Sequence, residues 1–449
     1  MTRWELAVGT DGRLQKLGDG LYFHRPPIEE FEVQRKQLED ALVKQDTLYA
    51  GRPFPSLPTA FVLRASLWRE SRDILSILCD LLEATAIWGR DEDQFVRHWQ
   101  LGDQELAMFR RTPWPKRLAP GIRFDCLVDC DGVKVVEVNT IFAFLAPSDG
   151  LAIAQRSLGV LEDADKELEL LHSPLVPKFH RYLTKNGVTR LGLVGHGPDS
   201  PMAFEYRYTL AALRREDLEG VHGYIGALST ADGPAITINR LRVDGVFLRE
   251  PYVSWPGHDE QRDVMLAAVE QGMPMFNPFE AMLLGSKASL AALHHPRFQM
   301  GLRAWQRELI ARHVPYTIVI PTAAGGERTE LLETLSAERE QWVLKPVDGW
   351  GGDGVVLGPY CAAHEWPNHL AATSARRYVA QRLVRLSTVE IPRPSRDYET
   401  HFANLCVFAI DGQAEGGCAR TSPKRVVNVL GTNIGSGGAV MPLFVAERL

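Results

Sequence analysis

The sequence predicts a mixed fold of the α+β or α/β class with a helical N-terminal region. Three observations lead to this prediction. Residues 28–45 and 62–90 carry apolar side chains at three-and-four spacing with charges on the other side, as amphipathic helices do. From residue 190 to residue 271, strand-like and helix-like segments alternate, which is typical of α/β structure. Residues 343–358 have the pattern of a strand, a glycine loop and a second strand.

The first unit is expected to span residues 1–115 and to consist mainly of the two helices. A proline-rich connection, GRPFPSLPTAF, joins them, and a second proline-rich break, RRTPWPKRLAPG, follows at 110–121. We recognise no family in this unit.

The second unit, residues 116–285, is expected to combine a hairpin with an α/β subdomain. IRFDCLVDCDGVKVVEVNT has two strand-like runs around an Asp-Gly turn, which predicts a β-hairpin. Apolar runs, turn residues and helical periodicity predict the later elements: a strand at 190–197, a helix at 204–220 closed by Gly220, a strand at 222–226, a hairpin at 236–250 with its turn at Asp244-Gly245, and helices at 259–271 and 278–293.

Two further units complete the chain. Residues 286–390 contain strand, helix and strand patterns ending in QWVLKP, then the glycine loop, a helix at 361–373 and the strand YVAQRLVRL. Residues 391–449 are rich in strands, contain the turn IDGQ and carry a second glycine-rich segment near their end. A chain of 449 residues has ample length for a large core.

Composition and charge narrow the class of protein. Apolar residues make up 45% and charged residues 24%, which is ordinary for a soluble globular protein. The formal net charge of −6 disfavours nucleic acid or an anionic membrane as the main partner. The chain shows neither an apolar signal region at its start nor a run approaching the roughly 20 apolar residues that span a bilayer. We therefore expect a soluble cytoplasmic protein.

The six cysteines indicate free thiols. They are few and scattered, and although Cys126 and Cys130 are four residues apart, no second pair or nearby histidine completes a zinc set. Free thiols in a reducing cytoplasm are the better interpretation.

The glycine loop VLKPVDGWGGDGVVLG raises three alternatives. Gly349-x-Gly351-x-x-Gly354 matches the dinucleotide fingerprint, but VVLGPY follows it as a strand, whereas that fingerprint requires a helix. A Walker A loop is absent because no Gly-Lys-Ser/Thr occurs. A hairpin with a flexible tip remains, whose backbone N–H groups can hold phosphates beside the charge of Lys345. An ordinary glycine-rich turn is the alternative.

The pattern Lys-Pro-x-Asp-Gly-x-Gly-Gly resembles the glycine loop of ATP-grasp ligases, particularly glutathione synthetases. This resemblance implies an ATP-grasp fold, in which ATP lies between antiparallel sheets. YVAQRLV resembles the hinge strand that contacts adenine, and LLGSKASLAAL resembles the segment that supplies a second lysine. Each of these two segments could also be a plain strand or a surface helix. The resemblance implies the following ATP-binding residues: Lys287, Lys345, Gly349, Gly351, Gly352, Ala380, Gln381 and Leu383.

A carboxylate and an amide stand two residues apart in VKVVEVNTIFAF, at Glu137 and Asn139. On a strand these side chains share one face, and their oxygens suit a hard cation such as Mg²⁺. Taken alone, the pair also fits a half-exposed hairpin with polar residues outward. Its place before the glycine loop resembles eukaryotic-type glutathione synthetases, whose ATP-grasp is circularly permuted. That resemblance implies metal ligation by Glu137 and Asn139 and a substrate-carboxylate contact by Arg123.

Two later segments extend the resemblance over roughly residues 120–445. FLREPY is similar to the family's Arg-x-x-Tyr substrate strand, which implies substrate contacts by Arg249 and Tyr252. GGCARTSPKRVVNVLGTNIGSGGAVMPLF resembles the Arg-Thr segment and glycine-rich loop that cover the active site. It implies a catalytic Arg420, although this residue could instead close a surface salt bridge. The loop glycines are Gly435, Gly437 and Gly438, of which the last two are expected to contact substrate.

The chain departs from the family at two places. The family has a glutamate metal ligand at the position of Gly349, and Asp348 stands one residue earlier as a candidate third ligand. The family has small hydroxyl residues where this chain has Phe142, Ala143 and Phe144, which argues against glutathione as the product.

These patterns predict an ADP-forming, ATP-dependent carboxylate–amine ligase with ATP and Mg²⁺ as cofactors. A substrate carboxylate would take the γ-phosphate, and an amine would then displace phosphate from the acyl phosphate. Arg420 and Lys345 would be catalytic, Arg420 by steadying the acyl phosphate and the oxyanion. The expected partners are a small carboxylate and a small amine, with amino acids or small peptides as the default, and the resemblance suggests a homodimer. Two rivals stay open: a kinase, and a non-catalytic ATP-binding module, which the missing loop glutamate favours.

Overall fold

The computed structural model describes most of the chain between residues 14 and 447. The positions outside the described residues are 19, 50, 91–98, 100–108, 110–113, 130–131, 142–144, 161–167, 196–202, 234, 250–256, 348, 350–351, 386, 394, 396 and 424–437, besides the two ends. The described residues form a mixed α/β structure, which confirms the predicted class.

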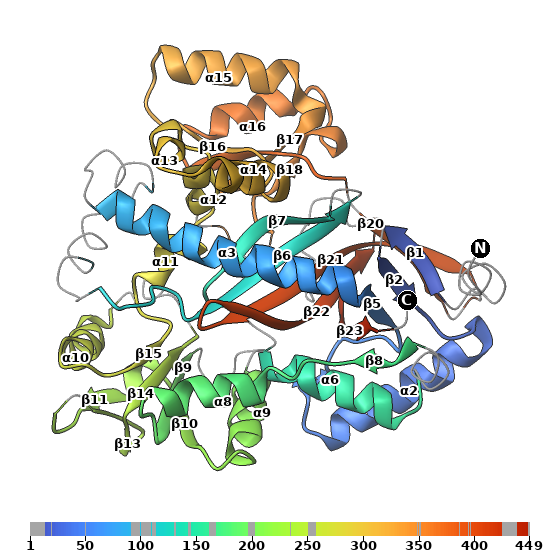
Figure 1. The fold of residues 1–449 in the computed structure, drawn as a ribbon, viewed down its shortest axis with the longest axis vertical. Coiled ribbons are helices and arrows are strands. Elements are labelled where there is room, and N and C mark those ends of the chain that lie inside the picture. Colours follow the sequence, from blue (N-terminus) through green and yellow to red (C-terminus); the bar gives the residue numbers. More distant parts are fainter. Residues whose placement is uncertain are drawn as a thin grey trace.

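A ten-stranded sheet forms the centre of the molecule (Figure 1). Its main path runs β1-β2-β5-β23-β22-β21-β6-β7, with β20 beside β21 and β8 beside β23. β5 and β23 pair in parallel, and the other described pairings in this sheet are antiparallel. The bounds are β1 (Leu14–Gly18), β2 (Leu21–His24), β5 (Ala60–Arg64), β6 (Gly121–Asp129), β7 (Gly132–Asn139), β8 (Leu170–Leu171), β20 (Ser387–Pro392), β21 (Tyr398–Ile410), β22 (Gln413–Pro423) and β23 (Ala439–Ala446).

Helices cover both faces of this sheet. Alternate residues of β21 divide between two hydrophobic clusters, one shared with the long helix α3 and one shared with α6, α8 and α9. This division follows from the two-residue period of a strand. Figure 1 shows α3 crossing the sheet on one side and α6, α8, α9 and α2 gathered below it. The bounds are α2 (Ile28–Lys44), α3 (Ala65–Arg90), α6 (Leu145–Ser157), α8 (Val176–Lys185) and α9 (Ala203–Arg214).

The N-terminal region contains strands as well as the two expected helices. α2 and α3 confirm the helices predicted at 28–45 and 62–90, but β1, β2 and β5 belong to the central sheet. The predicted second helix began inside β5, whose Phe61 pairs with Leu443 of β23. An apolar run that is buried on both faces cannot be separated from a buried helix by periodicity alone, and its pairing partner lies at the other end of the chain.

A small parallel sheet, in the order β10-β9-β14-β15, stands beside the central one. The hairpin predicted at 236–250 is wrong in its turn, because the chain reverses at Asn239 and Arg240, both with positive φ. The predicted helix at 204–220 ends at Arg214, and Gly220 lies in a strand. The bounds are β9 (Arg190–Gly195), β10 (Glu219–Tyr224), β11 (Leu228–Thr230), β12 (Ile236–Ile238), β13 (Leu241–Val243), β14 (Gly245–Leu248), α10 (Asp259–Glu270) and β15 (Met275–Phe276).

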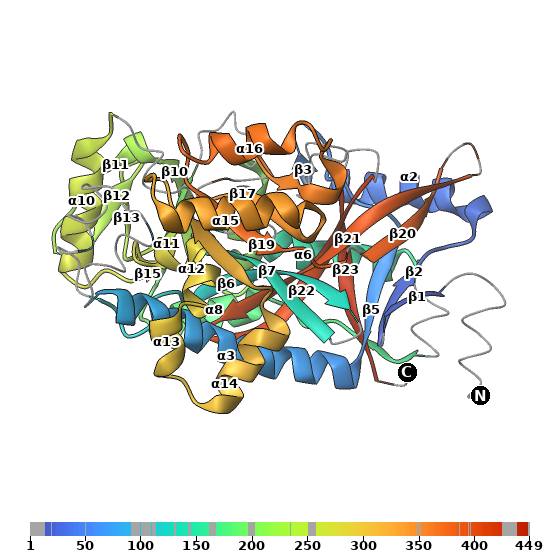
Figure 2. The same cartoon turned by 90° about the horizontal axis from the view of Figure 1, so that it is seen from above.

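A second antiparallel sheet, which we call the lid sheet, runs in the order β16-β19-β17-β18. α15 and α16 cover its outer face around a core that includes Leu335, Trp342 and Trp366 (Figure 2). β17 and β18 pair antiparallel and confirm the predicted glycine hairpin. The bounds are β16 (Thr317–Ile320), α15 (Gly326–Ala337), β17 (Trp342–Pro346), β18 (Val356–Leu357), α16 (Trp366–Ala372) and β19 (Tyr378–Arg382).

Short helices connect the parallel sheet to the lid sheet. The single helix predicted at 278–293 is interrupted at Ser286 and Lys287. The bounds are α11 (Ala281–Gly285), α12 (Ala288–Leu293), α13 (Pro296–Met300) and α14 (Ala304–His313). In the described part of the chain, no helix is both long and apolar enough to cross a membrane.

The cysteines that the structure describes are free thiols, in line with the prediction. They are Cys79, Cys126, Cys361, Cys406 and Cys418. Cys130 lies outside the described residues.

Candidate active site

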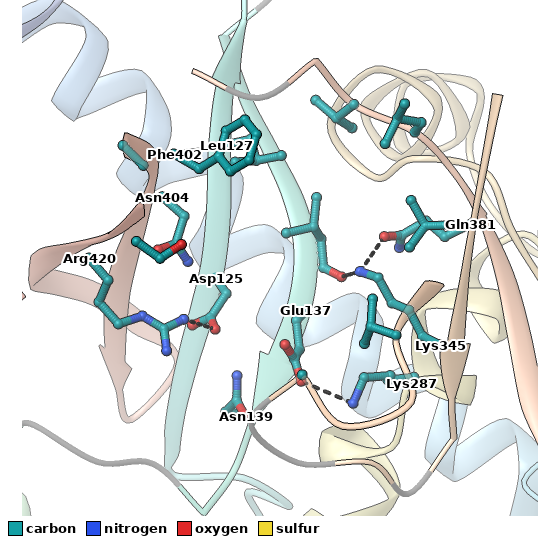
Figure 3. Close-up of a pocket in the computed structure, with 18 of the residues that line it drawn as sticks. Asp125, Leu127, Glu137, Asn139, Lys287, Lys345, Gln381, Phe402, Asn404 and Arg420 are labelled. Atoms are coloured by element: carbon teal, nitrogen blue, oxygen red, sulfur yellow. Dashed lines mark hydrogen bonds and ion pairs between the residues drawn. The ribbon is translucent and has the colours of Figure 1, made fainter. Parts of the chain in front are cut away.

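A pocket lies between the central sheet and the lid sheet (Figure 3). β6, β7, β21 and β22 supply one wall, and β17, β19 and the glycine hairpin supply the other. The pocket therefore joins segments that are far apart in the sequence. Its lining residues are Arg123, Asp125, Leu127, Val136, Glu137, Asn139, Lys287, Val343, Lys345, Gly352, Val355, Gln381, Arg382, Leu383, Val384, Phe402, Ala403, Asn404, Arg420 and Ser422.

Two arginines share one carboxylate on the wall formed by the central sheet. Arg123 Nε and Nη2 donate to Asp125 Oδ1 and Oδ2 at 2.8 and 3.1 Å, and Arg420 Nη2 donates to Asp125 Oδ2 at 2.5 Å. Burial alone would raise the pKa of the Asp125 carboxyl, but the two guanidiniums hold it below its ordinary value. The Asp125 carboxylate in turn raises the pKa of both arginines against the effect of burial. The cluster of Arg123, Arg420 and Asp125 carries one net positive charge, and the Glu137 carboxylate on the same wall balances it.

The β6–β7 hairpin places Asp125 directly opposite Glu137, and Arg123 directly opposite Asn139. Directly opposite residues of an antiparallel pair project to the same face. The carboxylate of Asp125 therefore shares this face with the predicted metal pair, and all three residues line the pocket. Figure 3 shows the side chains of Asp125, Glu137 and Asn139 grouped at its base.

Lys287 connects the metal-pair strand to the glycine hairpin. It stands at the break between α11 and α12. Its Nζ lies 3.0 Å from Glu137 Oε1 and donates to Gly349 O at 2.6 Å. The Lys287 side chain is only 7% exposed, so its charge is held inside the pocket wall.

Lys345 of β17 enters the same pocket from the lid sheet. Its Nζ donates to Gln381 Oε1 at 2.7 Å and to Val136 O at 2.9 Å. Gln381 Nε2 donates to Thr317 Oγ1 at 3.0 Å, which fixes the amide with its oxygen toward the lysine. The pKa of Lys345 is lowered to about 8, chiefly by burial and further by nearby Lys287, while Glu137 and Asp125 partly offset this lowering.

The structure brings together most of the predicted site residues that it describes. Ala380 lies beside this group but faces the core of the lid. Gly349 is tied to the pocket through its carbonyl, and Gly438 immediately precedes β23. The predicted residues that line the pocket are Arg123, Glu137, Asn139, Lys287, Lys345, Gly352, Gln381, Leu383 and Arg420. Asp348, Gly351, Tyr252, Gly435 and Gly437 lie outside the described residues.

Arg249 is not brought into this pocket. It follows β14 of the small parallel sheet, and its Nη2 donates to Glu205 Oε2 at 2.9 Å, with both side chains almost fully buried. Arg249 does not line this pocket, so the structure does not place it where it was expected to contact the substrate. The sequence pattern could not reveal the partner, because Glu205 lies on a separate helix, α9.

Asp125, Asn404 and Ser422 also line the pocket and were not predicted as site residues. Asp125 could have been predicted in the same way as the metal pair, because residues 123 and 125 of one strand project to the same face. Asn404 is opposite Arg420 in the pairing of β21 with β22. Only that long-range pairing identifies it, and no local signal in the sequence does.

The oxygen donors at the base of the pocket fit a divalent cation. Asp125 and Glu137 supply carboxylates, and hard cations prefer such ligands together with amide oxygens. Asn139 Nδ2 is buried without a hydrogen-bond partner in the described part of the structure. Rotation of this amide by half a turn exchanges its nitrogen and oxygen and presents an oxygen at that position. The donor set is thus one that Mg²⁺ can use.

Gly285 controls how closely the lysine segment approaches the metal-pair strand. A Cβ on Gly285 would lie 2.5 Å from Thr140 Oγ1, and Thr140 is buried next to Asn139. We therefore expect Gly285→Ala to lower the free energy of unfolding by about 1–3 kcal/mol through overpacking, as urea denaturation would measure. Gly326→Ala is the matched control, because a Cβ there meets nothing within 4 Å. Equal stability of the two variants would contradict the prediction.

The comparisons with known proteins give partial likenesses. No family model matches the chain. "Putative glutamate--cysteine ligase 2-3" of Frankia alni is 41% identical over 75 residues, which cover 15% of this chain and 8% of that protein. The corresponding "2-2" protein of Frankia casuarinae is 37% identical over 71 residues, with coverage of 15% and 8%. The chain therefore spans about a twelfth of the length of these relatives.

Among solved structures, the chain is similar to the crystal structure of a "Putative gamma-glutamylcysteine synthetase" from Methylobacillus flagellatus KT. The match covers 78% of this chain and 84% of that chain, with 12% sequence identity and a TM-score of 0.37. At that score the likeness supports no argument about the site, and the function is argued below from the pocket itself.

Proposed function

We propose that the chain is an ATP-dependent carboxylate–amine ligase with a circularly permuted ATP-grasp fold. One observation carries the proposal: two lysines, two arginines and three oxygen donors converge in a single pocket between two sheets. They come from segments that the family resemblance had selected separately along the chain. The short similarity to proteins named as glutamate–cysteine ligases agrees with this reaction class.

ATP would lie between the two walls. Apolar side chains of both sheets, Leu127, Val343, Val355 and Leu383 among them, line the pocket and suit a flat base. Lys345 and Lys287 would neutralise phosphate charge, and the glycine hairpin would offer backbone N–H groups to the phosphates. Gly352 has a φ of +84°, which a glycine adopts without strain.

Asp125, Glu137 and Asn139 would hold Mg²⁺ in this proposal. Asp125 replaces Asp348 as the third ligand we favour, because it faces the same space as the pair. The metal supplies charge neutralisation for the phosphates. Lys287, 3.0 Å from Glu137, would keep that carboxylate oriented toward the pocket.

The two arginines would act on the substrate carboxylate and its acyl phosphate. Arg123 is held by two hydrogen bonds to Asp125, which fixes the plane of its guanidinium. Arg420 Nε is buried without a hydrogen-bond partner among the described residues. This donor is available to an anion, so Arg420 would stabilise the acyl phosphate and the oxyanion formed when the amine attacks. The amide then forms as phosphate leaves.

The substrates in this proposal are a small carboxylate and a small amine of the amino-acid or peptide class, and the product is not glutathione. Neither nucleic acid nor a membrane takes part. We place the reaction in the cytoplasm and propose a homodimer.

The reaction is tested by incubating the protein with Mg-ATP and a matrix of paired acids and amines. ADP and phosphate are measured together, and each positive pair is examined by mass spectrometry. We expect equal ADP and phosphate, and a product lighter than the two substrates by one water. ADP without phosphate would indicate a kinase, and ATP binding without turnover in any pair would indicate a binding module; either result would overturn the proposal.

The buried Lys345 predicts a pH-dependent affinity for ATP. Its pKa is about 8 in the unliganded protein, so the side chain loses its charge as pH rises through this value. Above it, binding the phosphates must take up a proton, and the dissociation constant for ATP should rise by up to about tenfold per pH unit. Calorimetry between pH 6.5 and 9.5 would measure this. Lys345→Met should bind ATP weakly at every pH, and its dissociation constant should no longer depend on pH in this range. If the pH dependence is unchanged in Lys345→Met, the titrating group is not Lys345.

A further inference from the structure

The stretch CAAHEWPNH, residues 361–369, contains four potential metal ligands in nine positions. It lies in the lid, on the connection between the glycine hairpin and α16 (Figure 1). Short tracts rich in cysteine and histidine are typical of metal binding. The ligase proposed above makes no use of these side chains.

Three of these ligands converge in the structure. One ligand atom each from Cys361, Glu365 and His369 lie within 4.8 Å of one another. His369 N–H donates to Glu365 O at 3.2 Å, so these two residues stand one helical turn apart on the same side. Cys361 N–H donates to Leu357 O at 2.9 Å, which ties the cysteine to the end of β18.

The backbone that carries the three ligands is anchored from below. Trp366 is 1% exposed, and its Nε1 donates to Leu335 O of α15 at 3.1 Å. Arg339 Nη1 donates to Cys361 O at 2.5 Å and also to Gly358 O. The ligand side of this segment faces away from the core, with Cys361 and His369 half-buried and Glu365 exposed.

Glu365 and His369 are not engaged elsewhere. In the described structure, neither side chain takes part in a hydrogen bond or an ion pair with a protein group, while Cys361 Sγ makes one weak contact, to Ala362 O at 3.4 Å. A thiolate, an imidazole and a carboxylate form a mixed sulfur, nitrogen and oxygen set. Such a set suits a borderline-soft divalent metal in tetrahedral coordination, and hard cations such as Mg²⁺ select against sulfur.

We propose that Cys361, Glu365 and His369 bind one Zn²⁺-type divalent metal ion, with water or His364 in the fourth position. Binding converts the Cys361 thiol to a thiolate and releases one proton to solvent. The ion would fasten the end of the glycine hairpin to α16.

Cobalt(II) is the probe, because a thiolate ligand gives it a sulfur-to-metal charge-transfer band in the near ultraviolet. The full-length protein is stripped with a chelator, kept reduced with a phosphine, and titrated with Co²⁺ at pH 7.5. We expect one equivalent to produce the band and an equivalent of Zn²⁺ to abolish it. Cys361→Ser should eliminate the band, and His369→Ala should weaken Co²⁺ binding by more than about tenfold.

His180→Ala serves as the matched control, because it removes a half-buried histidine from α8, away from the lid. It should bind Co²⁺ as the unaltered protein does, and circular dichroism checks that all variants are folded. Absence of the band in the unaltered protein, or its persistence in Cys361→Ser, would overturn the site. The readout is independent of ligase activity, since the proposed Mg²⁺ ligands contain no sulfur.

Discussion

Replacing Glu137 by alanine is expected to reduce ATP-dependent turnover by at least about 10³-fold, which corresponds to about 4 kcal/mol of transition-state stabilisation. The Glu137 carboxylate lies in the pocket opposite Asp125 and 3.0 Å from Lys287. Its removal takes a charged ligand from the proposed Mg²⁺ site. Release of ADP under saturating Mg-ATP and substrates measures the loss.

A measurement of ATP binding without metal distinguishes the loss of a metal ligand from general damage to the pocket. In the presence of a chelator, Glu137→Ala should bind ATP about as well as the unaltered protein, because the missing ligand no longer matters. Asp129→Ala is the matched control: Asp129 ends β6 on the same hairpin, and its side chain is 25% exposed, against 30% for Glu137. Full turnover in Glu137→Ala would remove Glu137 from the metal site.

Replacing Arg420 by alanine is expected to lower kcat by about 10²- to 10³-fold with little change in the KM for ATP. Arg420 shares Asp125 with Arg123, so Asp125 keeps two hydrogen bonds after the substitution. The expected loss therefore lies in the acyl-transfer chemistry and not in folding. Steady-state kinetics with the substrate pair identified above measure it.

Arg420→Lys tests whether charge alone is enough. A lysine restores the positive charge but lacks the planar fork of the guanidinium, so we expect it not to recover kcat. Arg72→Ala is the control: Arg72 lies on α3 and donates to Ala414 O of β22, the strand that carries Arg420, but it does not line the pocket. Near-normal kcat in Arg420→Lys would mean that Arg420 acts only through its charge.

The parts of the fold that depend on neighbouring residues could be predicted from the sequence. The sequence of the β6–β7 hairpin has Asp-Gly between two apolar runs, and the glycine loop has a strand-like run on each side. Both hairpins could therefore be predicted, together with the side chains that share a face. The lid strand predicted at 378–386 is present as β19, which ends earlier, at Arg382. Within it, alternation explains why Gln381 faces the pocket while Ala380 faces the lid core.

The parts that depend on distant pairing could not be predicted. The joining of β5 to β23, and the place of Asn404 opposite Arg420, arise from strands whose partners leave no local trace. The pairing of Arg249, which follows β14, with Glu205 of α9 is likewise a contact between distant segments. A motif can indicate the chemical type of a side chain, but the partner that neutralises it is fixed only by packing.

The parallel pairing of β23 with β5 has a consequence for biosynthesis. Synthesis proceeds from the N-terminus, so β1, β2 and β5 leave the ribosome long before residues 439–446 exist. Until then β5 presents an unpaired apolar edge. β22, the strand that carries Arg420, also lacks one of its two neighbours. Such late, long-range closure is slow and exposed to aggregation. The chain should therefore depend on a chaperone during translation. A chain that ends before residue 439 should bind a hydrophobic dye and should not form the complete pocket.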